Sequence, residues 1–236
     1  MGEISEKIKK ELFQKKNPIR AKLQQGYFKT KKSEYGYGDI FLGITVPEQR
    51  LVAKKFKDAQ LQDIASLLKT GIHECRFTAL EILVMQYEEA KNDVTRKGIY
   101  ECYLANKKYI NNWDLVDTSA HYIVGDYLIA RNKKILYDLI KSHMLWDRRI
   151  ALVATYAFIK QNLFSDTLEL SKLVLNDKQD LIHKASGWML REVGKRSLQT
   201  LEEFLNEHAP QMPRTMLRYA LEKFLFDKRK KYLLLK

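Results

Sequence analysis

The chain has 236 residues and a formal net charge of +13, because 42 lysines and arginines outnumber 29 aspartates and glutamates. A chain of this length with 45% hydrophobic residues can bury a substantial core, which excludes a disordered protein. Only 10 glycines and 4 prolines argue against an all-β protein with many tight turns. The excess of positive charge predicts an anionic partner.

Composition also excludes several kinds of site. Cys75 and Cys102 lie far apart and outside any C-x-x-C pair, so we expect neither a disulfide framework nor a thiolate zinc site. The five histidines form no H-E-x-x-H pair, and we expect no metal and no cofactor. The first 14 residues interrupt every apolar pair with Lys or Glu, unlike a signal peptide or a membrane span. These features predict a cytoplasmic protein, in the bacterial cytosol or associated with the nucleoid, and no membrane partner.

The start of the chain predicts two helices followed by a loop. Ile4, Ile8 and Leu12 recur at helical spacing, and Asn17-Pro18 ends this helix and opens a second one. We therefore expect a helical hairpin over residues 1–32.

A loop over residues 33–46 should follow, because the Gly36-Tyr37-Gly38 stretch supplies two of the ten glycines. Pro47 lies where the first turn of the next helix is expected, since proline is tolerated at that position.

Repeated helix pairs are predicted for residues 47–236. Similar runs start at Arg76, Trp113, Arg149 and Lys184, at intervals of 37, 36 and 35 residues. Each interval fits two helices and two turns, the unit of HEAT-like solenoids. The sequence thus predicts an all-α fold, an α–α superhelix of HEAT-like repeats forming a single domain over residues 1–236, with a concave groove for a long ligand.

One helix, expected near residues 181–195, carries cations and an indole on one stripe. Its members, at i, i+4, i+7 and i+11, are Lys184, Trp188, Arg191 and Lys195. The opposite stripe is predicted to pack in the core and consists of Ile182, Ala185, Met189 and Val193. Further charge is supplied by Arg50, Lys54, Arg148 and Arg149. A solvated face explains any single cation, but a basic stripe with an aromatic side chain is typical of nucleic-acid binding.

A second helix, opening at Asn111-Asn112, carries a carboxylate in an unusual position. Either asparagine can cap the helix, and Trp113 and Asp117, four residues apart, project from the same face near its N-terminus. A carboxylate in a basic groove repels phosphate, so its presence calls for a reason other than binding. One such reason is a cation that forms during a reaction.

Several motifs resemble one known family over nearly the whole chain. They are Phe41-Leu42-Gly43-Ile44 with Pro47-Glu48-Gln49-Arg50, Trp113-Asp114-Leu115-Val116-Asp117 with Gly125-Asp126, Trp146-Asp147-Arg148-Arg149, and Lys184-Ala185-Ser186-Gly187-Trp188-Met189-Leu190-Arg191-Glu192. In these motifs the chain resembles the AlkD-type DNA alkylation repair glycosylases, which are built from HEAT-like repeats and act on N3- and N7-alkylated purines.

The resemblance implies a role for individual residues. Asp117 would be the catalytic carboxylate, Trp113 and Trp188 the indoles that flank the damaged nucleoside, and Arg149 the arginine beside them. The residues implied to contact the DNA backbone are Tyr27, Arg50, Lys184 and Arg191, and the charge pattern adds Lys54, Arg148 and Lys195. The expected partner is double-stranded DNA carrying alkylated purines such as 7-methylguanine, bound by a monomer.

Two other functions fit parts of the same pattern. A non-enzymatic HEAT-like protein that binds branched or distorted DNA would need the basic groove alone. A HEAT scaffold for an acidic protein partner would need the charge but neither the indoles nor the carboxylate.

Overall fold

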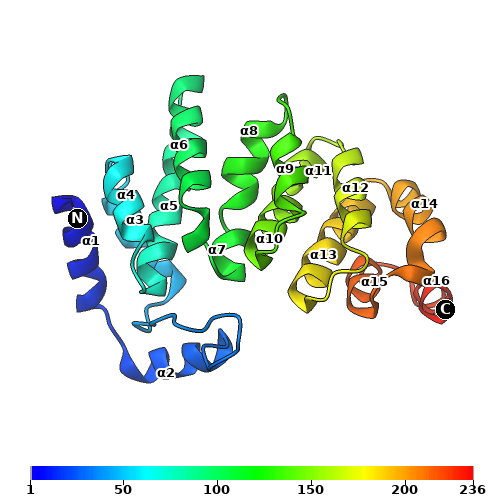
Figure 1. Ribbon diagram of the computed structural model, residues 1–236, viewed down its shortest axis with the longest axis horizontal. Helices are drawn as coiled ribbons and strands as arrows, with labels where there is room; N and C mark the ends of the chain where they lie inside the picture. Colours follow the sequence, from blue (N-terminus) through cyan, green and yellow to red (C-terminus); the bar gives the residue numbers. More distant parts are fainter. Residues whose placement is uncertain (1, 236) are drawn as a thin grey trace. The chain divides into compact units, whose positions relative to one another are not determined.

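The computed structural model describes residues 2–235, and this part of the chain is helical without a strand. The all-α prediction is therefore confirmed (Figure 1). The chain divides into two compact units, unit 1 up to Ile123 and unit 2 from Val124 onward, and each is described by itself. None of the helices within residues 2–235 combines the length and apolar character that a membrane span requires.

Unit 1 contains seven named α-helices within the described residues. They are α1 (Glu3–Gln14), α2 (Pro18–Tyr27), α3 (Val46–Lys55), α4 (Leu61–Leu68), α5 (His73–Glu89), α6 (Asp93–Ala105) and α7 (Trp113–Asp117). A 3-10 turn, Lys107–Tyr109, precedes α7, and a π-helical turn, His121–Gly125, follows it.

Unit 2 continues the helical pattern after that turn. Its helices are α8 (Asp126–Leu128), α9 (Lys134–Leu139), α10 (Leu145–Ala154), α11 (Tyr156–Lys160), α12 (Ser165–Leu173), α13 (Asp180–Arg196), α14 (Leu198–His208), α15 (Arg214–Ala220) and α16 (Phe226–Leu234). A 3-10 turn, Ala209–Gln211, joins α14 to the segment before α15.

The first two helices do not pair as a hairpin, contrary to the prediction for residues 1–32. Helix α1 buries Ile8 and Leu12 and packs against α3, α4 and α5, whereas α2 lies across the bottom of the view in Figure 1, apart from α1. Helix α2 buries only Ala21, and its larger apolar side chains are exposed to solvent, so they do not pack against α1.

The connection after α2 is longer than the predicted loop over residues 33–46. Helix α2 ends at Tyr27 because Lys29 has a left-handed backbone, with φ of 55°, and the irregular connection then runs over residues 28–45. It ends at a capping box, in which Thr45 accepts from the Glu48 N–H and Glu48 accepts from the Thr45 N–H. Pro47 lies in the first turn of α3, as predicted.

Helix α5 is the central helix of unit 1. It packs against α1, α3, α4, α6 and α7, and 13 of its 17 residues are buried. Because neighbours surround it, its apolar residues follow no single face, and charged residues are buried within it as well. Those buried charges require partners from the segments around them.

Helix α13 has the same role in unit 2 and packs against α10, α11, α12, α14 and α15. The predicted packing stripe is confirmed, since Ile182, Ala185, Met189 and Val193 are fully buried. At Gly187 a side chain would lie 2.4 Å from the Met216 carbonyl oxygen of α15. The glycine thus allows α13 and α15 to approach closely.

Every run that suggested a repeat lies in a helix. The runs at Arg76, Trp113, Arg149 and Lys184 lie in α5, α7, α10 and α13, respectively. Inside each unit these helices pack on one another, α5 on α7 and α10 on α13, and a preceding helix covers three of them: α4 on α5, α9 on α10 and α12 on α13.

Gly43 anchors the long connection to the start of α2. Its φ is +84°, and an added Cβ would lie 2.1 Å from the Asn17 carbonyl oxygen. The Asn17 N–H also donates to the Leu42 carbonyl at 2.8 Å, so the two segments cross with their backbones in contact. Only glycine combines this backbone conformation with so close an approach.

We predict that Gly43→Ala destabilises the protein by roughly 2 kcal/mol or more, because it imposes both a strained φ and a steric clash. Denaturant unfolding would measure the loss. Gly26→Ala is the matched control, since nothing lies within 4 Å of its added Cβ and the position is helical. Equal stability of the two variants would contradict the role assigned to Gly43.

Candidate functional site

Helix α7 presents Trp113 and Asp117 on one short turn. Asn112 caps the helix by accepting from the Trp113 N–H at 2.8 Å, which decides between the two possible caps. Both predicted side chains are half-buried. The helix has only five residues and Asp117 is its last, so the positive end of the helix lies next to Trp113 and Asp114 instead of Asp117.

Trp113 belongs to a stack of aromatic rings. Its indole lies 5.3 Å from the Phe28 ring at an interplanar angle of 16°, and Phe28 stacks in turn on Phe41 at 4.9 Å. Tyr27 meets Trp113 edge-on, with ring centroids 5.9 Å apart. The structure therefore places predicted site residues from α2 and α7 side by side within unit 1, and it holds the indole by contacts on its face and edge.

The stack ends on a buried histidine held between two carboxylates. His73, the first residue of α5, lies 4.5 Å from the Phe41 ring. Its Nδ1 is 3.2 Å from Asp39 Oδ2, and its Nε2 is 2.8 Å from Asp114 Oδ2. Asp114 directly follows Trp113, so the histidine fixes the first turn of α7 to α5 and to the loop that carries Asp39.

The charges of this cluster keep His73 protonated. Burial alone would disfavour the imidazolium, but the Asp114 and Asp39 carboxylates outweigh burial and raise the pKa of His73 to about 9. Burial likewise opposes the charge on Asp39, yet His73 and Arg76 lower the pKa of that carboxyl below its ordinary value. Arg76 Nη2 lies 2.7 Å from Asp39 Oδ1, and Arg76 also donates to Asn111. Opposite charges thus compensate one another in the core.

Asp117 lies beside a buried hydroxyl pair. Tyr103 OH and Ser119 Oγ are 3.1 Å apart, and the Ser119 hydroxyl donates to the Leu115 carbonyl at 2.5 Å. Burial raises the pKa of Tyr103, and the nearby Asp117 charge raises that pKa further. The tyrosine therefore stays neutral.

The predicted cations of α3 differ in their surroundings. Arg50 is exposed and donates to both carboxylate oxygens of Glu81, at 3.2 and 3.3 Å. Burial raises the pKa of Glu81, although Arg50 opposes that shift. Lys54 is exposed and lies one turn further along α3.

In unit 2, the buried carboxylate of Glu192 contacts three of the four residues of the predicted stripe. Its Oε1 accepts from Trp188 Nε1 at 3.2 Å and from Lys195 Nζ at 2.7 Å, and Arg191 Nε lies 3.4 Å away. Glu192 is only 8% exposed. The carboxylate fixes the rotamer of the half-buried indole and offsets part of the positive charge beside it.

The remaining cations of α13 are paired as well. Lys184 lies 2.8 Å from Asp180, and its hydrogen bond lowers the pKa of that carboxyl. Arg191 also pairs with Glu222. The stripe therefore exists as predicted in position, but neighbouring carboxylates compensate its charge.

The two arginines of α10 form hydrogen bonds to other residues of unit 2. Arg148 is half-buried and donates to Asp177 through Nε and Nη2, at 2.7 and 3.3 Å. Arg149 is 5% exposed and donates from Nη1 to the Leu181 carbonyl at 2.5 Å. Arg149 thus supports the start of α13 from below instead of displaying its guanidinium on the surface.

Sequence reasoning missed three residues that organise these sites: His73, Asp114 and Glu192. A signal existed for two of them, since Asp114 follows Trp113 and Glu192 lies four residues after Trp188 and three before Lys195. No comparable spacing marks His73, which meets its partners from 34 and 41 residues away.

Within residues 2–235 no group of three or more His, Cys, Asp or Glu side chains is arranged to hold a metal ion. Both cysteines are free thiols, and burial raises the pKa of Cys75 to about 12 and that of Cys102 above its ordinary value.

Comparisons with known proteins give a family and a likeness to solved structures. Residues 8–224 match the family model described as "DNA alkylation repair enzyme". A solved structure described as a predicted DNA alkylation repair enzyme from Enterococcus faecalis superposes with a TM-score of 0.71 at 18% identity, covering 90% of this chain and 98% of that one. No curated protein matches the chain. The structural neighbour confirms the predicted superhelical repeat fold.

We predict that the protein loses stability as the pH rises into the alkaline range, because the His73 cluster then loses its positive charge. Because the pKa of His73 is about 9 in the fold and 6.5 for the free side chain, its stabilisation is complete below pH 6.5 and is lost as the pH rises through 9. The full effect is about 3 kcal/mol.

Denaturant unfolding between pH 6 and pH 10 would measure this loss, with His73→Gln as the variant that lacks the titration. His143→Gln, at an exposed position, is the control and should follow the parent. A parent whose stability runs parallel to that of His73→Gln up to pH 10 would show that the cluster does not need the charged imidazole.

Proposed function

Since the chain belongs to the DNA alkylation repair enzyme family, we propose that it is a monofunctional DNA glycosylase of base excision repair. Its substrates would be positively charged N7- and N3-alkylated purines, such as 7-methylguanine, in duplex DNA. The observation that supports the proposal best is that the short helix α7 carries both the Asp117 carboxylate and the Trp113 indole, and that the aromatic stack holds this indole in place.

The chemistry requires only one carboxylate. An N7-alkylated guanine already carries positive charge, so when the C1′–N9 bond breaks its electron pair neutralises the base, and no general acid is needed. The sugar becomes an oxocarbenium-like cation, a water oxygen attacks C1′, and the water proton passes to Asp117 or to solvent. Glycosidases that act on neutral sugars need a second carboxyl group for the step that is unnecessary here.

Asp117 would stabilise the sugar cation and orient the water. A carboxylate about 4 Å from a unit positive charge, at an effective dielectric constant near 20, gives at most about 4 kcal/mol of attraction. Only the part that grows between ground state and transition state accelerates the reaction, and each 1.4 kcal/mol of that part is about tenfold in rate.

Each indole would offer a π face to a cationic base or sugar. Each such contact contributes roughly 0.5 to 2 kcal/mol. Trp113 is held by Phe28 and Tyr27, and Trp188 by its bond to Glu192, so both rings are ordered before substrate arrives. Arg149 would act by positioning α13 through its bond to Leu181.

The backbone of the duplex would be held by the exposed or half-buried cations. These are Arg50, Lys54, Arg148, Lys184, Arg191 and Lys195, together with the hydroxyl of Tyr27. Several of them exchange an acidic partner for a phosphate when DNA binds, so their net contribution is smaller than that of unpaired cations.

We predict that Asp117→Asn lowers the rate of 7-methylguanine release from methylated duplex DNA by about 100-fold or more, corresponding to roughly 2.7 kcal/mol of lost transition-state stabilisation. Affinity for undamaged duplex should be retained or slightly increased, because the substitution keeps the shape and removes a negative charge that repels phosphate. Single-turnover base release and equilibrium binding measure the two quantities.

Asp58→Asn is the matched control, because it removes one exposed carboxylate from the same unit. It should release base at the parental rate. Parental base release by Asp117→Asn would refute the mechanism. A parent that binds DNA but releases no alkylated base would instead favour the non-enzymatic binder of branched or distorted DNA.

We further predict that Glu192→Gln and Glu192→Ala have the same effect on DNA binding but different effects on base release. The comparison separates the charge of Glu192 from its role in positioning the Trp188 indole. Both substitutions free Lys195 from its carboxylate, whereas Arg191 keeps its pair with Glu222. Duplex binding should therefore tighten at low salt, and its salt dependence should steepen by about one phosphate equivalent. Only Ala leaves Trp188 Nε1 without an acceptor, and it should slow base release by about tenfold.

Glu203→Gln, at an exposed position of α14, is the control for the charge change. If Gln and Ala slow base release equally, the bond from Trp188 does not position the indole. If neither variant steepens the salt dependence, the cations around Glu192 do not meet phosphate.

A further inference from the structure

The segment before, within and after α2 carries most of the uncompensated charge of unit 1. Residues 12–33 contain seven cationic side chains and no carboxylate, against a net charge of +13 for the whole chain. The seven are Lys15, Lys16, Arg20, Lys22, Lys29, Lys31 and Lys32. Helix α2 occupies the middle of this segment.

Six of these seven cations are exposed lysines. Arg20 is engaged, since Nη1 donates to the Gly43 carbonyl at 2.9 Å and lies 3.3 Å from Glu48. The lysines form no ion pair with any residue in the described range 2–235. This contrasts with α13, where Lys184, Arg191 and Lys195 are each paired to a carboxylate. A polyanion that binds the lysines therefore breaks no ion pair of these side chains.

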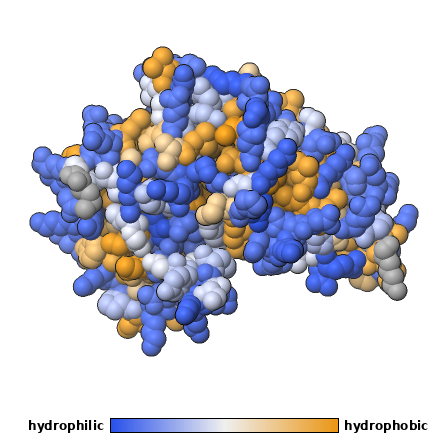
Figure 2. All heavy atoms as spheres, in the orientation of Figure 1, coloured by the Kyte–Doolittle hydropathy of each residue, from blue (hydrophilic) through white to orange (hydrophobic). Residues whose placement is uncertain are grey.

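Helix α2 also turns an apolar stripe toward solvent. Ile19, Leu23 and Tyr27, at i, i+4 and i+8, are 80%, 70% and 66% exposed. The opposite face is anchored by Ala21 and by the following Phe28, which form a core cluster with Phe41. Over the part of the molecule that α2 occupies, Figure 2 shows projecting hydrophilic side chains with apolar ones between them.

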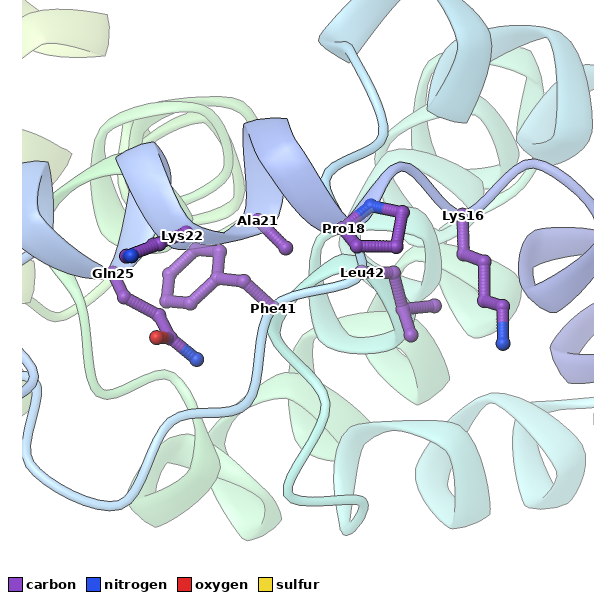
Figure 3. A pocket seen from close by; sticks show the side chains of 7 residues that line it. All are labelled: Lys16, Pro18, Ala21, Lys22, Gln25, Phe41 and Leu42. Atoms are coloured by element: carbon purple, nitrogen blue, oxygen red, sulfur yellow. The ribbon is translucent and has the colours of Figure 1, made fainter.

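A cleft runs beneath the same helix. Its volume is about 480 Å³, and Figure 3 shows Phe41 and Leu42 below α2, with Lys16 beside Leu42 and Gln25 beside Phe41. Lys22 also lines it. The lysines thus border apolar surface both inside the cleft and along the exposed stripe.

We propose that α2 with its flanking lysines is a docking surface for the sugar–phosphate backbone of double-stranded DNA, separate from the cations of α13. The lysines meet phosphates, and the apolar stripe packs against the deoxyribose between them. The choice of DNA rests on the proposed function. The stripe ends at Tyr27, whose ring contacts Trp113, so a backbone that follows α2 is led to the proposed catalytic helix.

The same pattern of lysines around an apolar stripe also occurs in helices that bind anionic membranes. Such helices bury a broad apolar face in the lipid, and their affinity grows with that area. Helix α2 has 10 residues, and the stripe contributes three side chains. The other face is already packed on Phe41, which leaves little apolar area for lipid.

The test is the salt dependence of binding to a fluorescent undamaged duplex, measured by anisotropy. The variant Lys22→Gln/Lys29→Gln/Lys31→Gln changes three exposed side chains that have no partner to lose, so the fold should be retained. If all three meet phosphate, the slope of log K against log salt becomes shallower by about 2 to 3. Affinity at moderate salt should fall by about tenfold or more.

The matched control is Lys69→Gln/Lys91→Gln/Lys97→Gln, which removes the same charge from exposed positions of unit 1. Its slope should change by less than about one. An equal change in both triple variants would overturn the proposal, since only net charge would matter. Loss of binding to phosphatidylserine vesicles by the α2 variant, with an unchanged DNA slope, would also overturn it in favour of a membrane surface.

Base release at saturating DNA separates this proposal from the proposed function. A parent whose DNA slope depends on α2, but which releases no 7-methylguanine, supports the docking surface and refutes the glycosylase. A parent that releases the base while the α2 variant keeps the parental slope refutes the docking surface alone.

Discussion

Three backbone N–H groups converge on one buried carboxylate, and the arrangement of unit 1 depends on that contact. Glu74, 1% exposed, accepts from Leu42 at 2.9 Å, Gly43 at 2.7 Å and Ile44 at 3.3 Å. A carboxylate buried in this way is tolerated only if all its partners are present, and losing one costs several kcal/mol. The loop is thereby fixed on α5, and its contacts at Asn17 fix α2. His73, one residue earlier, ties α7 to the same point, so Tyr27 and Trp113 meet.

Helices and their repetition could be predicted from the sequence because apolar periodicity is local. The core stripe of α13 and the helix start at Pro47 needed only neighbouring residues to be recognised. The course of α2 could not be predicted in this way. It depends on bonds between residues about 30 positions apart, such as Leu42 with Glu74, and on a positive φ at Gly43. Local pattern contains neither, so a simple hairpin was the natural but wrong expectation.

In the candidate site, too, the features set by spacing along the chain could be predicted, and those set by contacts between distant segments could not. Spacing alone placed Trp113 and Asp117 on one turn, and placed Trp188 beside cations. Spacing could not predict which partner each cation binds or whether its side chain is buried. Arg148 and Arg149 are adjacent and of one type, yet one is half-buried on Asp177 and the other lies in the core beneath Leu181. The partners of these two arginines depend on rotamers and on segments about 30 residues away in the chain. Glu192 differs, because its partners Trp188 and Lys195 lie on its own helix, within reach of a local spacing argument.

The full burial of Cys75 and the partial burial of Cys102 have a consequence for a protein of a DNA alkylation repair family. The electrophiles that methylate purines also attack sulfur, and they do so through the thiolate. With the pKa of Cys75 at about 12 and that of Cys102 also raised by burial, both sulfurs remain protonated at neutral pH. The thiolate form of both cysteines is thus disfavoured, which lowers the reactivity of these side chains towards the electrophiles that create the proposed substrates.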